Sequence, residues 1–172
     1  MASAGHSLSP SGTAGQDDQT MIEIADVTSL GASLGRELAV SEWIEMPQSR
    51  IDRFADATED RQWIHVDVTR AAQESPHGAT IAHGFLTLSL VPALLRGALG
   101  FPRVGMAINY GLNRVRFVSS VPAGTRIRGR FTPLAVTAHA DTSVDVTWAV
   151  TVEREHGDKP CCVAEWIVRY YV

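Results

Sequence analysis

Two residues with proton-exchanging side chains, Asp60 and His65, are separated by four residues in the middle of the first half of the chain. A carboxylate and an imidazole that converge on one water molecule can share the work of general base and general acid. Further on, His83-Gly84 opens a strongly apolar segment. A backbone N–H at such a helix start can stabilise developing negative charge on an oxygen. Residues of these types are able to carry out acid–base chemistry with water at a carbonyl compound, although the Asp60–His65 pair alone is a weak signal.

Each of these residues also has a purely structural interpretation. Asp60 could cap the turn after a helix, since Asp is common there. His65 could lie at the surface or at the edge of the core, and His83 could orient a loop or cap the helix without reacting. Taken singly, Asp60 and His65 favour the structural interpretation. Catalysis is favoured only if the two residues and His83-Gly84 match the motif of a family that uses them together.

Three neighbouring residues have lesser roles in this interpretation. Asp67 is expected to be the N-cap of a helix that begins at Val68. Ser89 lies inside the apolar segment, where its hydroxyl can bond a local carbonyl or help to place a substrate. Trp63 is expected to pack beside the Asp60–His65 pair.

The elements that must position these residues begin with helices. Apolar residues at three- and four-residue spacing, after Pro47, predict an amphipathic helix over 48–58. A short second helix is expected over 68–74, followed by the breaker cluster 75–78. The segment 59–66 between them has no clean period. A long apolar helix over 81–99 is closed by Gly100 and Pro102.

Strand patterns occupy most of the remaining sequence, over 37–46, 107–118, 125–133, 143–153 and 161–172. The clearest alternation runs through Val144, Val146, Trp148, Val150 and Val152. One strand, then helices, then four strands is an α+β layout. A helix that is apolar nearly all round must be buried on several sides, and a curved antiparallel sheet wrapped around it provides that burial. This is the hot-dog fold.

Composition narrows the class of protein. A chain of 172 residues with 45% hydrophobic residues suits one domain, expected over 21–172, after a disordered tail over 1–20. A net charge of −4 argues against an obligate nucleic-acid binder. Cys161 and Cys162 are adjacent, offer no metal-ligand spacing and fit a cytoplasmic protein. Arg96 and Pro92 favour a buried helix over a membrane span in 81–101.

The segments 54–67 and 81–90 together resemble the MaoC-like dehydratases, which include NodN-like proteins and (R)-specific enoyl-CoA hydratases. The family's motif is roughly D-x(4)-H, then a gap, then a helix that starts with H-G. Asp60 and His65 match the first part and His83-Gly84 match the second. The resemblance covers most of the chain from about Thr28 onward.

The resemblance implies a hot-dog fold, a homodimer and a substrate that is an acyl-CoA or an acyl-carrier thioester. It implies that Asp60 and His65 hold the water added to a 2-enoyl thioester, with an (R)-3-hydroxyacyl product. The backbone N–H of Gly84 would meet the thioester carbonyl, with His83 and Ser89 near the substrate. No metal and no separate cofactor are expected.

Two rival functions stay open at this point. A hot-dog thioesterase has the same fold and also acts on thioesters, so the fold cannot separate the two activities. A non-catalytic acyl-thioester binding subunit is the second rival, and the presence of both Asp60 and His65 speaks against it. Free thiol release distinguishes the thioesterase.

Five arginines alternate with apolar residues in the strand region. The simpler interpretation is a solvated sheet face, and the alternative is contact with coenzyme A phosphates, which suit the guanidinium fork. The five are Arg114, Arg116, Arg126, Arg128 and Arg130.

Overall fold

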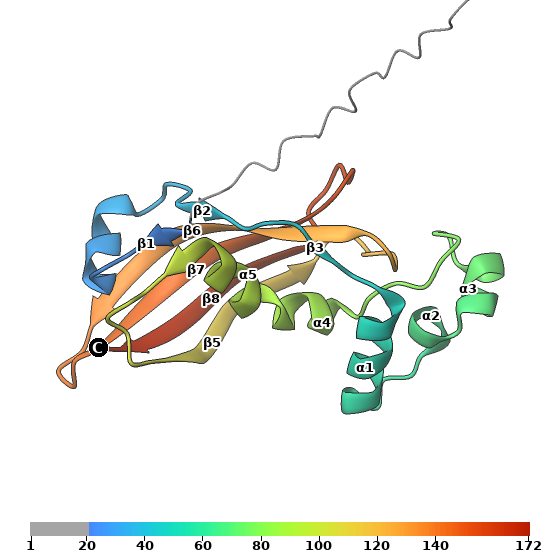
Figure 1. Ribbon diagram of the computed structural model, residues 1–172, viewed down its shortest axis with the longest axis horizontal. Coiled ribbons are helices and arrows are strands. Elements are labelled where there is room, and N and C mark those ends of the chain that lie inside the picture. Colours follow the sequence, from blue (N-terminus) through green and yellow to red (C-terminus); the bar gives the residue numbers. More distant parts are fainter. Residues whose placement is uncertain (1–20) are drawn as a thin grey trace, which may run out of the picture.

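The computed structural model describes residues 21–172, and one large antiparallel sheet dominates it (Figure 1). The expected tail over 1–20 lies outside the described residues. The sheet has the strand order β2-β6-β7-β8-β5, and β3 also pairs with β6. Its strands are β2 (Ala39–Val40), β3 (Ile44–Glu45), β5 (Met106–Phe117), β6 (Arg126–Ala138), β7 (Ser143–Arg154) and β8 (Cys162–Tyr171).

Side chains alternate across the long strands as the sequence predicts. Val144, Val146, Trp148, Val150 and Val152 of β7 are all buried, and the intervening residues from Asp145 to Thr151 are half-exposed. On β8, alternate residues from Cys162 to Tyr170 are buried in the same way. The buried face of both strands therefore forms one wall of the core.

The helical layer on that wall differs from the expectation in one respect. Instead of one helix over 81–99, the structure has α4 (Gly84–Ser89) and α5 (Val91–Ala98), joined at Leu90. Pro92 stands in the first turn of α5 and has no N–H to donate to the carbonyl of Leu88, so the helix breaks there. Both parts run along one face of the sheet (Figure 1), and Leu94 and Leu95 are buried against it.

Three further helices lie beyond the end of α4 (Figure 1). They are α1 (Gln48–Thr58), α2 (Trp63–Val66) and α3 (Val68–Glu74). The bounds of α1 and α3 are those expected from the sequence, and Asp67 caps α3 by accepting the N–H of Arg70 at 2.9 Å. The single turn α2 was not predicted. Ile51 and Ala55 of α1 are fully buried and fix α1 to the rest of the molecule.

The first strand region was predicted as one strand over 37–46 but forms two short ones. Between β2 and β3, Ser41 bonds both backbone groups of Gly129: its N–H donates to the Gly129 carbonyl and its hydroxyl accepts the Gly129 N–H. This local bonding replaces the regular ladder, so the strand bulges away from β6. The segment 28–35 forms most of the 3₁₀ helix η1 (Val27–Ser33).

Two small features complete the fold. β1 (Ile22–Glu23) pairs in parallel with β4 (Leu99–Gly100) directly after α5. Across residues 21–172, no helix reaches the length and apolar character that crossing a bilayer requires.

Candidate active site

His65 is held in a fixed orientation at the junction of α2 and α4. Its side chain is buried, and its Nδ1 lies 2.6 Å from the carbonyl oxygen of Ile81. Because a carbonyl can only accept, Nδ1 carries the proton and Nε2 keeps a lone pair in the neutral ring. Burial lowers the pKa of His65 below its ordinary 6.5, and the nearby His83 lowers it further. The ring is therefore neutral at pH 7 and can accept a proton at Nε2.

His83 contacts both of the residues predicted to carry chemistry. It is the N-cap of α4, and its ring stacks on that of His65 with centroids 3.7 Å apart and planes at 25°. Its Nε2 lies 2.9 Å from the carbonyl oxygen of Asp60, while its buried Nδ1 has no hydrogen-bond partner among the described residues. Phe54 covers the ring at a centroid distance of 5.1 Å. His83 thus ties the Asp60 loop to the start of α4.

Asp60 projects from the loop that follows α1. That helix ends at Glu59, which adopts a left-handed conformation with φ of 62° and turns the chain toward His83. Asp60 is exposed, and its carboxylate belongs to a group with His65 and His83 in which one polar atom of each residue lies within 4.8 Å of the others. The structure therefore brings Asp60 and His65 together, as their spacing predicts.

These three residues are of the types that bind metal ions, but their arrangement does not suit one. The lone pair of an imidazole nitrogen lies in the ring plane, and metal-ligating histidines aim these lone pairs at a common point. The rings of His65 and His83 are stacked, so their lone pairs lie in nearly parallel planes. The arrangement suits proton transfer better than coordination.

Gly84 is the first residue of α4 and borders a cleft of about 250 Å³ that also reaches His65. In the first turn of a helix the N–H has no intrahelical acceptor, so it is available to a ligand. A Cβ at this position would lie 2.7 Å from the ring of Phe117, closer than real contacts allow. Glycine is therefore required for the ring of Phe117 to lie against the backbone here.

Cys161 also lines the cleft, which raises the question of a thiol nucleophile. Burial raises its pKa to about 11, and its Sγ donates to the carbonyl of Val152 at 3.2 Å. A thiol that stays protonated at neutral pH is a poor nucleophile. The adjacent Cys162 is buried as well, and both cysteines are free.

Ser89 does not reach the cleft with His65. It is exposed, and its hydroxyl donates to the carbonyl of Phe85 at 2.7 Å, the local bond that its place in a helix allows. It borders a different cavity of about 320 Å³ between α4 and β5, next to Leu112 and Trp166. Trp63 packs under the guanidinium of Arg70, 4.2 Å from the ring centroid.

The arginines divide into two groups. Arg126, Arg128 and Arg130 form ion pairs with Glu155, Glu153 and Glu37, as expected of a solvated sheet face. Arg114 and Arg116 of β5 are exposed, and within residues 21–172 neither is within ion-pair distance of a carboxylate.

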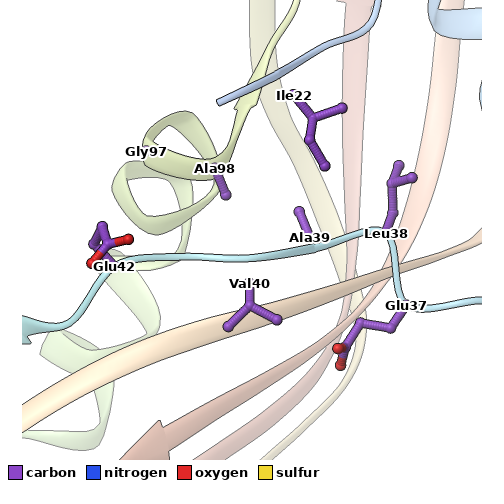
Figure 2. A pocket seen from close by; sticks show the side chains of 8 residues that line it. All are labelled: Ile22, Glu37, Leu38, Ala39, Val40, Glu42, Gly97 and Ala98. Carbon is purple, nitrogen blue, oxygen red and sulfur yellow. The ribbon is translucent and has the colours of Figure 1, made fainter. Parts of the chain in front are cut away.

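A third concave region lies at the C-terminal end of α5. A pocket of about 150 Å³ lies between β2 and the end of α5, and Figure 2 shows Ala39 and Ala98 on its walls. Its two carboxylates are Glu37 and Glu42, and Glu37 is already paired with Arg130. It contains no histidine or cysteine, whereas His65 and Cys161 both line the cleft at Gly84.

Comparison with known proteins identifies the family. The MaoC-like domain profile matches residues 29–155. The chain belongs to the MaoC-like family. A 3-hydroxyacyl-thioester dehydratase Z of Mycobacterium tuberculosis is 47% identical over 144 residues, which cover 84% of this chain and 95% of that protein. The predicted resemblance is confirmed, and so is the prediction of a hydratase or dehydratase type of enzyme.

Two other similarities extend this result. Nodulation protein N of Rhizobium leguminosarum bv. viciae is 48% identical over 149 residues, covering 85% of this MaoC-like chain and 89% of the relative. The solved structure of an R-hydratase from Pseudomonas aeruginosa superposes with a TM-score of 0.61 at 22% identity, covering 81% of this chain and 84% of that one. The shared architecture confirms the predicted hot-dog fold.

Sequence reasoning missed two residues: Gln48, which bonds the carbonyl of His65, and Thr80, whose hydroxyl donates to Gln48. Gln48 looks like an ordinary polar residue in the first turn of α1, and Thr80 follows a breaker cluster. Nothing in their local sequence marks them, because what matters is their contact with each other across the fold.

Proposed function

We propose that this protein catalyses the reversible addition of water to a 2-enoyl thioester, with Asp60 and His65 as the acid–base pair. Water attacks the β-carbon and loses a proton to the pair, and the α-carbon receives a proton from it. The reverse reaction removes water from a 3-hydroxyacyl thioester. The observation that carries this proposal is the buried, neutral His65 with its Nδ1 fixed on Ile81 and Asp60 within reach.

The start of α4 supplies the second requirement of this reaction. As water adds to the β-carbon, negative charge moves to the thioester oxygen, and a fixed N–H donor stabilises it. Gly84 offers such an N–H in the cleft that contains His65. Since the residue lacks a side chain, a thioester can approach its backbone closely.

The relatives support the choice of substrate class. One is named for 3-hydroxyacyl-thioester dehydration, and a structural neighbour is named an R-hydratase. We infer from these names that the substrate is a CoA or carrier-bound thioester and the product has the (R) configuration. No separate cofactor is needed, because acid, base and oxyanion donor are all protein groups.

The apolar groove beside α5 supports an acyl substrate. The cavity next to Ser89, of about 320 Å³, shares Pro92, Asn109 and Trp166 with a second one of about 440 Å³ that reaches Tyr170. Most of the side chains along both are apolar. The groove begins one turn of α4 beyond Gly84, so an acyl chain whose thioester sits at Gly84 can extend along it.

We also propose that the working form is a homodimer joined along β5. Among residues 21–172 this strand pairs with β8 on one side only, and Met106, Ile108, Tyr110 and Leu112 are each 39–55% exposed. A long apolar edge of this kind is normally covered by another chain. Ile108→Lys should shift the mass measured by sedimentation from dimer to monomer; a parent protein that sediments as a monomer would contradict the proposal.

The test of the function uses crotonyl-CoA with two readouts, the loss of enoyl-thioester absorbance and the release of free thiol. Asp60→Asn and His65→Gln keep the size of each side chain and remove its proton transfer, so each should lower the hydration rate by about 10²–10⁴-fold. Loss of absorbance without thiol release in the parent supports the hydratase. Thiol release without hydration would establish a thioesterase instead.

We also propose a cytoplasmic location and a contact of two arginines with coenzyme A. A cytoplasmic enzyme of acyl-thioester, and hence fatty acid, metabolism is consistent with two buried free thiols. Arg114 and Arg116 are candidates for coenzyme A phosphates because, unlike Arg126, Arg128 and Arg130, they are not engaged with carboxylates among residues 21–172.

A further inference from the structure

A glutamine outside the acid–base pair bonds to the backbone of His65. Gln48 is the first residue of α1, and its Nε2 donates to the carbonyl oxygen of His65 at 2.8 Å. The same Nε2 donates to Asp52 Oδ1 at 2.8 Å, one turn along α1. On the other side of the amide, Oε1 accepts the hydroxyl proton of Thr80.

Thr80 leads directly to the group that orients the imidazole. It is 1% exposed, and the next residue, Ile81, accepts the Nδ1–H of His65 at 2.6 Å. The N–H of Ile81 donates to the carbonyl of Ile64 at 2.9 Å. Gln48, His65, Ile81 and Thr80 thus form a closed circuit, in which the side chain and the carbonyl of His65 are each held by a partner.

The direction of every bond in this circuit is fixed. Both Nε2 hydrogens of Gln48 meet oxygens that can only accept, the His65 carbonyl and the Asp52 carboxylate. A flipped amide would place Oε1 against these two acceptors and Nε2 against the hydroxyl. A network in which each member is satisfied in one orientation gives a single arrangement rather than a set of alternatives.

We propose that Gln48 and Thr80 are positioning residues for His65: by fixing the segment 80–81 against the His65 backbone, they keep Nδ1–H on the Ile81 carbonyl and Nε2 directed at the substrate. Without them, the ring is free to rotate or to move its proton to Nε2, which removes the base. The effect on turnover rests on the proposed function, whereas the effect on the proton position does not.

A role in folding alone would give a different pattern. Ile51 and Ala55 anchor α1 independently of Gln48, since both are fully buried. Loss of the circuit should therefore leave α1 in place and act on the imidazole. Asp52 offers a matched control, because it takes the second Nε2 hydrogen of Gln48 but has no hydrogen bond to the His65 segment.

The kinetic experiment compares four variants of the full chain with crotonyl-CoA. Thr80→Val keeps the shape and removes the hydroxyl, and Gln48→Leu removes the amide. Each should lower kcat by about 10–100-fold with KM little changed, the size expected when a reacting group is misplaced by a fraction of an ångström to 1 Å. Thr80→Ser restores the hydroxyl and Asp52→Ala spares the circuit, so both should stay within about twofold of the parent.

A second readout does not depend on turnover. The ¹⁵N shifts of the His65 ring report which nitrogen carries the proton, and the parent should show protonated Nδ1. Thr80→Val should give a mixture of both tautomers, and Thr80→Ser should not. If Gln48→Leu does not fold, Thr80→Val still carries the test.

The outcomes distinguish failure of the positioning role from failure of the proposed function. A parental tautomer in Thr80→Val, or parental kcat in both Thr80→Val and Gln48→Leu, would overturn the positioning role. A parent that shows protonated Nδ1 but hydrates no enoyl thioester would instead sink the proposed function and leave the positioning of His65 standing. The double variant Gln48→Leu/Thr80→Val would support a shared circuit if its kcat were no lower than that of either single variant.

Discussion

The two groups of polar residues in this molecule follow opposite rules. At the junction of α1, α2 and α4, His65 and His83 are buried, and each ring has one nitrogen on a main-chain carbonyl. On the outer face of the sheet, Arg130 is half-exposed and contacts Glu37 and also Glu153. Each buried histidine thus has one carbonyl partner, whereas the half-exposed Arg130 has two carboxylate partners.

The difference teaches where this protein can do chemistry. At the buried site, removal of water disfavours the charged form of His65 and lowers its pKa. The hydrogen bond to the Ile81 carbonyl holds its ring in one orientation. On the sheet face, the hydrogen bond to Glu37 raises the pKa of Arg130, a side chain that is already charged at neutral pH, so its protonation state does not change. Exposed pairs of this kind each contribute about 0.2–1 kcal/mol to stability. Burial, and not the number of polar contacts, distinguishes the two histidines of the site from the arginines of the sheet face.

Beyond the acid–base pair itself, the largest expected effect comes from a change that adds only a methyl group. Gly84→Ala places a Cβ 2.7 Å from the Phe117 ring, so the ring or the start of α4 must shift. Because the Gly84 N–H must meet the thioester oxygen, kcat/KM should fall by about 10²-fold, as when an oxyanion donor is lost. The measurement is hydration of crotonyl-CoA, with the melting temperature taken in parallel.

Gly97 supplies the control for that change. It lies in α5, and a Cβ there would have no atom within 4 Å. Gly97→Ala should stabilise the protein by about 0.4–1 kcal/mol and leave kcat/KM unchanged. Equal activity in the two alanine variants would remove the start of α4 from the mechanism.

The extent to which the sequence predicts the fold depends on how local the signal is. Pro47 and the spacing of Ile51, Phe54 and Ala55 predict α1 with the bounds that the structure shows. The alternation of apolar and polar residues likewise predicts the buried face of β7. The break at Leu90 was missed because the apolar period runs on through it, and Pro92, which was used only as an argument against a membrane span, is the local signal that marks it. The turn α2 was missed because four residues hold no period at all.

The same distinction applies to the site. The spacing of Asp60 and His65 is local, and the sequence predicted that they act together. The stacking of His83 on His65 and the bonds of Gln48 join residues far apart in the chain. Such contacts exist only once the α1 and α4 segments have packed, so no pattern in one stretch of sequence can reveal them.

The smallest expected effect is a shift of the pH profile of kcat/KM. It tests directly whether the buried histidines and the exposed arginines behave differently. Catalysis needs neutral His65, whose pKa lies below its ordinary 6.5 because the ring is buried. The acid limb of kcat/KM against pH should therefore have its midpoint below 6.5. Arg130→Met removes a charge from the sheet face, where Arg130 is paired with Glu37 and Glu153 and not with a site residue, so its profile should match that of the parent.

The free energy of unfolding should also depend on the protonation of His65. An unfolded chain protonates His65 as the pH falls through 6.5, while the folded chain resists until its lower pKa is reached, so the folded state binds fewer protons in that window. The free energy of unfolding should thus decline as the pH falls from 6.5 to the folded pKa and then level off as far as this group is concerned. His65→Gln should lose that part of the decline in urea titrations at several pH values, and Arg130→Met should retain it. A parental slope in His65→Gln would mean that burial does not set the protonation of His65, and the contrast between the buried site and the exposed face would fail at the residue on which it depends most.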